Sequence, residues 1–237
     1  YLRAECESVV GKLRSPIRVV IERVRVEIPR QLQGVDLTLS KGINIKYALD
    51  SYIGGVEVSN GVYYGVHLEG CYNMSLDGLK VSGSNYTGTG YGLQTYGCTL
   101  TNVRNSVFDN CRRGIDFSGG NIISLYSLAE ANTVIGSGVA SNGIPFGWGD
   151  EWDTGEDCSG IGTHGTAKYT TIRNNTFINL TRGVVNRSLY TDVVGNKFLG
   201  RFLECVHNSH GFAVNILNNS FDSNIFGVVS TSPQGAA

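Results

Sequence analysis

The sequence predicts an all-β fold, a right-handed single-stranded parallel β-helix whose coils are about 22 residues long. The first observation is a phrase that recurs at regular intervals: an apolar residue, then Asn or Gly, then a second apolar or aromatic residue. Its copies end at Val81, Phe108, Phe177, Phe198 and Phe221, and a weaker copy ends at Val134, inside the long gap between Phe108 and Phe177. A fixed period of roughly 20–30 residues is typical of stacked repeats.

Composition is the second observation that favours this fold. The chain holds 20 Asn and 32 Gly, residues that tolerate the left-handed backbone of tight coil corners. Charged residues make up only 16%, against about 25% in ordinary domains. The segments between the turns are short and rich in Val, Ile, Thr, Phe and Tyr, which is typical of strands. Stacked coils should place equivalent Phe rings on one another and let turn Asn side chains bond the next coil.

We divide the chain into three parts. Residues 1–60 are predicted to be N-terminal strands that cap and enter the β-helix, residues 61–230 form the helix with a functional insertion at 137–168, and residues 231–237 are a loop-like tail. Alternation of apolar and polar residues supports the early strands. The residues predicted to share one face are Val24, Val26 and Ile28 in one strand, and Ile43, Ile45 and Tyr47 in a later one.

The six cysteines are predicted to be buried free thiols. Cys71 and Cys98 end the same phrase in two successive copies, so they should stack as small apolar fillers. Free thiols favour folding in a cytoplasm over an oxidising compartment. Six N-x-S/T sequons are present, and those inside the repeated phrase are interpreted as turn residues. The sequons lie at Asn73, Asn85, Asn174, Asn179, Asn186 and Asn218.

Charge and hydropathy argue against two partners. The formal net charge is −1 and no basic stripe with interleaved aromatic residues is present, which disfavours nucleic acid as a partner. The apolar runs are all far shorter than a membrane-spanning helix requires, so we expect no membrane span. The chain begins with Tyr1 and lacks a signal-peptide pattern, which indicates a fragment or a processed product.

The insertion carries the residues best suited to chemistry. It contains both tryptophans, Trp148 and Trp152, and a dense run of five carboxylates, followed by His164. Exposed Trp rings stack on pyranose faces, while paired carboxyl groups supply the acid and the base or nucleophile of glycosidic cleavage. The predicted catalytic residues are Glu156, Asp157, Asp153 and His164. The predicted substrate-binding residues are Trp148, Trp152, Asp150, Arg112 and Arg113.

Plainer interpretations of the same residues stay open. The acidic run also fits a solvated loop, and the spacing of Asp150, Asp153 and Asp157 is compatible with oxygen ligands of Ca²⁺, although we predict no cofactor and no metal. His164 also fits a hydrogen-bonded loop histidine. Arg112 and Arg113 suit either the grip of an acidic sugar or a ladder of solvated surface charge.

Two segments carry a resemblance to a known superfamily. Residues 156–165 (EDCSGIGTHG) and 169–177 (YTTIRNNTF) resemble the right-handed parallel β-helix superfamily of pectin lyases, polygalacturonases and phage tailspikes. Its tailspike branch implies a homotrimeric receptor-binding protein of the virion tail, folded in the host cytoplasm, that binds and often cleaves bacterial surface polysaccharide. A secreted or extracellular protein is the alternative location.

Two classes of function follow. The first is a polysaccharide depolymerase, with glycoside hydrolysis favoured over lyase chemistry. The second is a non-enzymatic β-helical module for virion structure or adhesion. The two differ in whether residues 148–164 form a groove in which two carboxyl groups face each other.

Overall fold

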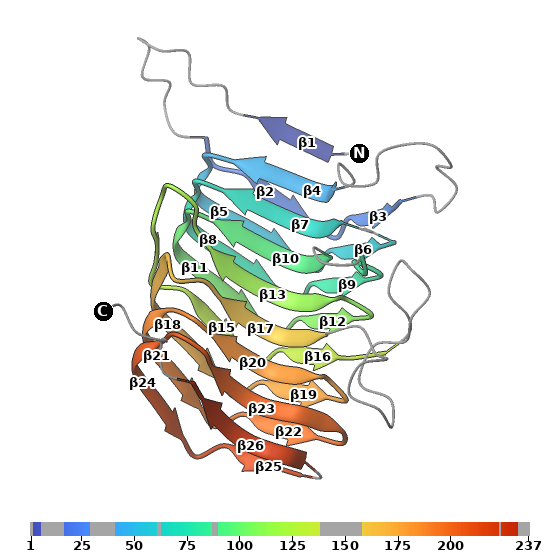
Figure 1. The fold of residues 1–237 in the computed structure, drawn as a ribbon. Coiled ribbons are helices and arrows are strands. Elements are labelled where there is room, and N and C mark those ends of the chain that lie inside the picture. The colour runs from blue at the N-terminus through green and yellow to red at the C-terminus, as the bar shows by residue number, and fades with distance from the viewer. Residues whose placement is uncertain are drawn as a thin grey trace.

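The chain folds into a stack of parallel coils. A computed structural model describes residues 2–5, 17–28, 41–60, 63–86, 90–137, 158–222 and 224–231. These residues form 26 strands in three sheets, and each coil passes through sheets 1, 2 and 3 in turn. The path winds in the right-handed sense as the stack advances (Figure 1), as the handedness rule for parallel crossovers requires. The predicted all-β, right-handed parallel β-helix is therefore confirmed.

The strands of the three sheets are as follows. Sheet 1 contains β1 (Leu2–Glu5), β4 (Lys41–Lys46), β7 (Tyr64–Glu69), β10 (Tyr91–Tyr96), β13 (Arg113–Ser118), β17 (Ser159–Thr163), β20 (Arg182–Asn186), β23 (Phe202–Asn208) and β26 (Asn224–Ser230). Sheet 2 contains β2 (Val20–Glu22), β5 (Leu49–Gly54), β8 (Tyr72–Asp77), β11 (Thr99–Arg104), β14 (Ser124–Leu125), β15 (Leu128–Glu130), β18 (Ala167–Arg173), β21 (Leu189–Val194) and β24 (Phe212–Leu217). Sheet 3 contains β3 (Arg25–Glu27), β6 (Glu57–Ser59), β9 (Lys80–Ser82), β12 (Val107–Asp109), β16 (Thr133–Ile135), β19 (Thr176–Ile178), β22 (Lys197–Leu199) and β25 (Ser220–Phe221).

Residues in register along sheet 1 mark the same point of each coil. One such ladder consists of Ile43, Val66, Leu93, Ile115, Ile161, Val184, Val206 and Val228. Its steps are similar in length except for the step from Ile115 to Ile161, which is about twice the others. This long coil contains residues 138–157, which lie outside the described residues. The regular coil resumes at Ser159 in β17, which lies in register between β13 and β20.

The repeated phrase of the sequence forms sheet 3. Its end positions stack in register, and the weak copy at Val134 lies between Phe108 and Phe177. Rings of Phe177 and Phe198 stack with centroids 4.9 Å apart, and Phe198 stacks on Phe221 at 5.2 Å. Phe221 is 39% exposed because it belongs to the last coil, whereas the other three Phe rings are fully buried. The predicted Phe stack is thus observed, with Val134 separating Phe108 from the rest.

Asparagine forms a second ladder, at the turn that leads into sheet 3. Asn132, Asn175, Asn196 and Asn219 are linked in succession, each Nδ2 donating to the next Oδ1 over 3.0 Å. Each side chain also donates to a backbone carbonyl of the previous coil, and each Oδ1 except the first accepts a backbone N–H of the preceding member. These bonds satisfy polar groups that burial would otherwise penalise, so Asn serves as a structural residue here.

Coil corners explain other Asn residues and one incorrect prediction. Asn73, Asn174, Asn179 and Asn218 have positive φ angles of 52–55°, as expected for turn residues. Tyr47 was predicted to face inward with Ile43 and Ile45, but it is 47% exposed while the two isoleucines are buried. The chain turns at Tyr47, whose φ is +57°, and this turn ends the alternation of β4.

The five described cysteines are buried free thiols, as predicted for these positions. Cys71 and Cys98 are neighbours in one ladder, where the Cys71 N–H donates to the Cys98 sulfur over 3.4 Å. Burial raises the pKa of Cys111 to about 12, which keeps this thiol protonated and unreactive. Cys6 lies outside the described residues.

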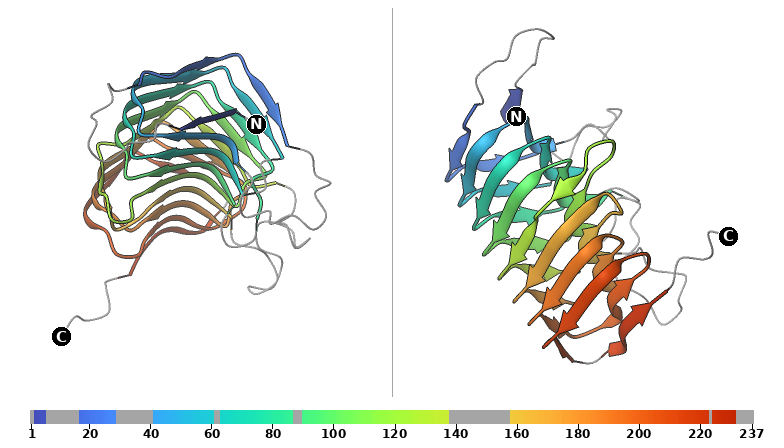
Figure 2. Two further views of the ribbon diagram at one scale, coloured as in Figure 1. Left: turned by 90° about the horizontal axis from the view of Figure 1, so that it is seen from above. Right: turned by 90° about the vertical axis from the view of Figure 1, so that its left-hand side faces the viewer.

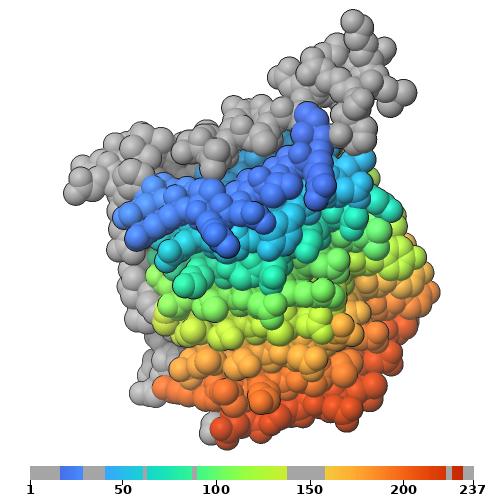
Figure 3. Space-filling model, turned by 180° about the vertical axis from the view of Figure 1, so that it is seen from behind, coloured from blue at the N-terminus to red at the C-terminus, as the bar shows by residue number. Residues whose placement is uncertain are grey.

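The stack is elongated, and each coil touches its neighbours in sequence order. Figure 2 shows the coils overlaid in the left view and arranged as successive layers in the right view. The space-filling view in Figure 3 shows the same order as bands of colour from the N-terminal to the C-terminal end. Among the described residues, no helix is long and apolar enough to cross a membrane. This architecture produces a rigid, extended surface on which equivalent side chains of successive coils lie one strand spacing apart.

Candidate functional site

Three tyrosines form a row on the outer face of sheet 2. The tyrosine row consists of Tyr126, Tyr169 and Tyr190, which occupy the same register position on successive coils. Centroids of the Tyr126 and Tyr169 rings lie 5.1 Å apart, and those of Tyr169 and Tyr190 lie 4.8 Å apart at an interplanar angle of 7°. All three have positive φ, from 55° to 58°, which turns their side chains outward at a bend of the strand. The row is therefore a rigid aromatic wall that projects into solvent.

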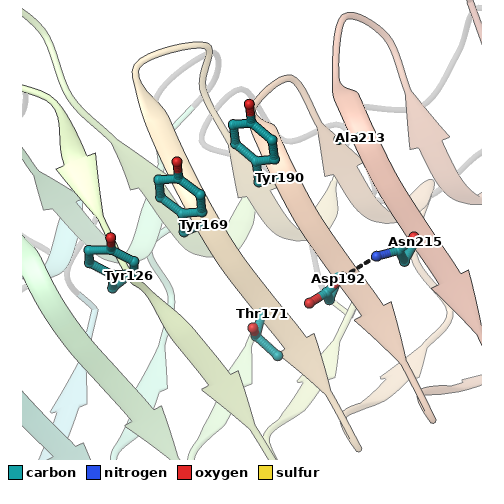
Figure 4. A pocket seen from close by; sticks show the side chains of 7 residues that line it. All are labelled: Tyr126, Tyr169, Thr171, Tyr190, Asp192, Ala213 and Asn215. Carbon is teal, nitrogen blue, oxygen red and sulfur yellow. Dashed lines mark hydrogen bonds between the residues drawn. The ribbon is translucent and has the colours of Figure 1, made fainter.

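A groove runs beside the tyrosine row. It encloses about 380 Å³ and is lined by the three tyrosines together with Thr171, Asp192, Ala213 and Asn215. Thr171, Asp192 and Asn215 also stand in one register row, two residues further along their strands (Figure 4). The Asn215 amide donates to Asp192 Oδ1 over 2.8 Å. Sheet 2 thus carries two parallel rows, one aromatic and one polar.

This pairing of rows suits recognition of a carbohydrate. Ring faces and edges offer apolar contact to sugar C–H groups, while hydroxyl, carboxylate and amide groups bond the sugar hydroxyls. Because the rows are fixed to a sheet, binding costs little ordering of the protein. The groove is therefore a candidate binding site for an extended sugar chain.

A cluster of charged side chains lies on the outer face of sheet 1. This charge cluster consists of Arg113 and Asp116 from β13 and of His164, which directly follows β17. Arg113 Nη1 donates to Asp116 Oδ1 over 2.5 Å, and His164 Nε2 lies 3.3 Å from the same oxygen. Arg113 Nε donates to Ser159 Oγ over 3.0 Å, and Gln94 Nε2 donates to Asp116 Oδ2 over 3.1 Å. Asp116 is 0% exposed, whereas His164 is 36% exposed, so the imidazole is the face of the cluster toward solvent.

The charges of the cluster control its ionisation. Burial alone would raise the pKa of Asp116, but the Arg113 guanidinium and the hydrogen-bonded His164 outweigh it and hold this pKa well below its usual range. The guanidinium lies over Gly162, where a Cβ would meet Arg113 Cδ at 2.8 Å, so glycine provides its space. Arg113 also stacks on the ring of Tyr91, 5.7 Å from the centroid. The carboxylate is therefore a permanent anion that can orient His164.

A buried histidine continues this outer row toward the N-terminus. His67 is in register with Asn44 and Gln94. Its Nδ1 lies 2.9 Å from Asn44 Oδ1 and 3.4 Å from Lys41 Nζ. Burial, followed by the charge of Lys41, lowers the pKa of His67 from 6.5 to about 4. His67 is thus neutral at physiological pH.

Most of the predicted site residues lie outside the described part of the chain. This holds for Trp148, Asp150, Trp152, Asp153, Glu156 and Asp157, and therefore also for the carboxylates compatible with Ca²⁺. Their roles stay predictions. Within the described residues, no group of three or more His, Cys, Asp or Glu side chains is arranged to hold a metal ion.

Three predicted residues are described, and two of them meet. His164 and Arg113 come within 3.4 Å, Nε2 to Nη1, although 51 positions separate them in sequence. Their meeting depends on β17 lying directly beside β13. Arg112 precedes β13, is half-buried, and its backbone N–H donates to the Ser84 carbonyl over 3.0 Å.

The tyrosine row and its polar partners were missed at the sequence level. A signal was present, because Tyr126, Tyr169 and Tyr190 stand at one fixed offset before the end of the repeated phrase, at Val134, Phe177 and Phe198. Tyrosine recurring at one offset of a repeat predicts a ladder on one face of the solenoid.

Comparison with known proteins supports the fold. Neither a protein-family model nor a curated protein sequence matches the chain. Among solved structures, PfbA, a surface adhesin of Streptococcus pneumoniae, is similar with a TM-score of 0.57 at 10% identity, over 90% of this chain and 58% of that chain. The tailspike protein gp49 from Pseudomonas phage LKA1 has a TM-score of 0.48 at 12% identity, over 92% of this chain and 49% of that chain.

The likeness at these identities concerns the fold. The Dettilon tailspike protein gives a TM-score of 0.45 at 15% identity, over 93% of this chain and 49% of that chain. The chain thus spans roughly half the length of these structures. The chain has the right-handed parallel β-helix fold that the sequence predicted.

Proposed function

We propose that this chain is a tailspike-like receptor-binding protein that binds bacterial surface polysaccharide along the groove of sheet 2. The observation that carries the proposal is the pairing of the tyrosine row with Thr171, Asp192 and Asn215 on a rigid sheet. The groove follows the stacking direction and so offers repeated contacts to a repeating polymer. Multiple weak contacts along one chain add to a useful affinity.

Cleavage is the finer part of the proposal. We assign it to the carboxylates Asp153, Glu156 and Asp157, with hydrolysis preferred to elimination. His164 is the described group best placed for proton transfer, since ionised Asp116 orients its imidazole while its other side meets solvent. The alternative is a non-enzymatic β-helical module for virion structure or adhesion.

Binding is tested with a panel of bacterial capsular and O-antigen polysaccharides in affinity electrophoresis. Retardation by at least one polysaccharide is expected for the wild type. Tyr190→Ala should weaken it about tenfold, because a stacked aromatic contact is lost. Tyr72→Ala is the matched control, since Tyr72 is also half exposed on sheet 2 but does not line the groove. If no polysaccharide is bound, or if both variants behave alike, the proposal fails.

Cleavage is tested on the same polysaccharides by release of reducing ends. Glu156→Gln should abolish release while binding persists, because the amide keeps the shape but cannot transfer a proton. Full activity in the Gln or Asn variants of Glu156, Asp157 and Asp153 would move the site to the charge cluster. Binding without any cleavage of the panel supports the adhesion alternative.

The proposed virion role includes a homotrimer. A solenoid exposes the edges of its end coils, and assembly is one way to cover such edges. Static light scattering at micromolar concentration should give three times the mass of the chain, 25.5 kDa. A monomer under these conditions contradicts the trimer for this chain.

A further inference from the structure

We propose that the outer face of the Tyr190 ring, above Ala213, is the primary sugar subsite of the groove and selects a non-acidic pyranose. The inference rests on the polysaccharide binding proposed above and specifies where it occurs and which sugars it accepts. Three features of the molecule carry it: the register of sheet 2, the packing of the rings and the charge of the groove floor.

The register places Ala213 where the tyrosine row would continue. Tyr190 is in register with Ala213 on β24, just as Tyr169 is in register with Tyr190. At the opposite end of the row, Leu100 on β11 is in register with Tyr126. The row therefore ends against a bulky side chain on one side and a methyl group on the other.

The missing ring leaves one aromatic face uncovered. Tyr169 has a ring stacked on both faces and is 43% exposed, whereas the two ends of the row, Tyr126 and Tyr190, are 52% and 51% exposed and each stacks on Tyr169 alone among the described rings. Of these two ends, the one at Tyr190 has only the Ala213 methyl group in the next register position. Figure 4 shows Ala213 beside Tyr190 on the neighbouring strand. Tyr169 and Tyr190, one ladder step apart, have ring centroids separated by 4.8 Å, so a flat ring placed one step further, above Ala213, would stack on Tyr190 in the same way.

The floor beside this position determines the class of sugar. Asp192 and Asn215 lie two residues further along the same two strands and face the groove. Asp192 Oδ1 accepts the Asn215 amide, which leaves Oδ2 and the Asn215 carbonyl directed to accept sugar hydroxyls. Asp192 is the one charged side chain among the described residues that line the groove. A uronic acid stacked on Tyr190 would meet a like charge, while a neutral or amino sugar would not.

The decisive variant is Ala213→Tyr, which fills the subsite with the residue type of the row. Ala213 has a φ of +53°, and Tyr126, Tyr169 and Tyr190 adopt 55–58° at the equivalent positions, so the backbone accommodates tyrosine. Leu100→Tyr is the matched control, because Leu100 has a φ of +57° and extends the row at its far end without lining the groove. Both variants should keep the melting temperature of the wild type or raise it.

Binding is measured by saturation-transfer NMR with methyl glycosides of glucose, galactose, mannose, rhamnose and N-acetylglucosamine, and with methyl glucuronide and galacturonide as acidic counterparts. Signals are expected for at least one non-acidic glycoside with the wild type and with Leu100→Tyr, and about tenfold weaker binding with Ala213→Tyr. Asp192→Asn should admit the acidic glycosides. Equal binding to Ala213→Tyr and Leu100→Tyr overturns the subsite, as does a preference of the wild type for acidic sugars or no signal with any glycoside. If the subsite is overturned in one of these ways but a whole polysaccharide still retards the protein in affinity electrophoresis, the proposed function remains supported.

Discussion

Asp116 shows how one residue depends on neighbours that are distant in sequence. Its carboxylate is fully buried on the outer face of sheet 1, and Arg113, His164 and Gln94 supply every polar contact described for it. Removing one partner of a buried ion pair leaves the other charge uncompensated. The contribution of the charge cluster to stability therefore belongs to the Arg113–Asp116 ion pair as a unit and cannot be divided between the two residues.

The first prediction concerns this pair. Asp116→Asn should lower the free energy of unfolding by about 3–5 kcal/mol, because it removes the carboxylate of a buried, hydrogen-bonded ion pair. Asp192→Asn, in the open groove, is the control and should cost less than about 1 kcal/mol. Urea denaturation followed by circular dichroism measures both. An Asp116→Asn protein as stable as the wild type would mean that the guanidinium is compensated by other groups.

Asp116 also predicts part of the acid response. The folded-state pKa lies below the unfolded value of 3.8, so the stabilisation is fully present above that value and is lost as pH falls from it toward the folded pKa. The wild type should therefore lose stability in acid more steeply than Asp116→Asn below this point. Parallel acid titrations of the two proteins, monitored by circular dichroism, check the difference.

His67 predicts a second pH dependence, at milder pH. Because the pKa is about 4 in the folded state and 6.5 as the unperturbed value, the unfolded state binds the proton more readily between these limits. The contribution of neutral His67 is fully present above pH 6.5 and declines as pH falls toward 4, by about 1.4 kcal/mol per pH unit. His67→Gln should remove this slope from urea denaturation series, and exposed His210→Gln should keep it. Equal slopes in both variants would contradict the lowered pKa.

At the scale of the element, the sheets differ in how they use the repeat. Sheet 3 fills the core with Phe and Val, and the turn before it carries the buried Asn ladder. Sheet 2 presents its tyrosine row to solvent, whereas the outer row of sheet 1, with Asn44, His67, Gln94 and Asp116, is buried. A ladder in the middle of the stack has partners on both sides, whereas a member of the last coil has one. The same substitution should therefore lower the free energy of unfolding more at an interior coil than at the last coil of the ladder.

The Phe stack of sheet 3 tests this expectation. Phe177→Ala should cost about 3–5 kcal/mol, because the ring is fully buried and stacked on Phe198. Phe221→Ala removes the same atoms from a ring that is 39% exposed and should cost clearly less. Chemical denaturation of the two variants gives the comparison. Equal losses would show that the last coil is as tightly packed as the interior.

The fold could be predicted because the repeated phrase coincides with one structural unit. Each copy supplies a buried ring or Val at a fixed place, so counting residues from Phe108 to Phe221 already assigns the register of sheet 3. The outer rows were harder to predict, since outward positions tolerate many residue types and a single Tyr in a turn carries little information. Only the comparison of equal offsets reveals Tyr126, Tyr169 and Tyr190 as one row.

The charge cluster could not be predicted in the same way. His164 stands close in sequence to Glu156 and Asp157, which suggested a single acidic site in the insertion. In the structure the regular coil has already resumed at Ser159, so His164 lies beside β13 and its buried Asp116. The contact depends on β17 pairing with β13 across a coil of irregular length, and such a coil interrupts the periodic signal of the sequence.

At the scale of the whole molecule, a stack of coils is held together by nearest-neighbour contacts. Across the described strands, pairing joins one coil to the next in sequence order, so stability should vary along the axis. β13 lies between β10 and β17 with every residue buried, whereas β24 pairs only with β21 among the described strands and is largely exposed. The groove extends from Tyr126, on an interior coil that has neighbours on both sides, to Ala213 and Asn215 on the last described strand of sheet 2, which has a neighbour on one side.

The rate of backbone amide hydrogen exchange should therefore increase toward the C-terminal coil. Amides of β24 are expected to exchange at least about tenfold faster than those of β13, because opening the end coil breaks one set of contacts while opening an interior coil breaks two. Mass spectrometry of peptides from both strands measures this ratio. β11, which is paired on both sides, should exchange like β13, and β21, next to β24, should fall between β13 and β24. If all four strands exchange at one rate, the solenoid opens as a single cooperative unit. In that case the Tyr190 face over β24 is as rigid as the interior of the row, and sugar binding at Ala213 should not protect β24 further.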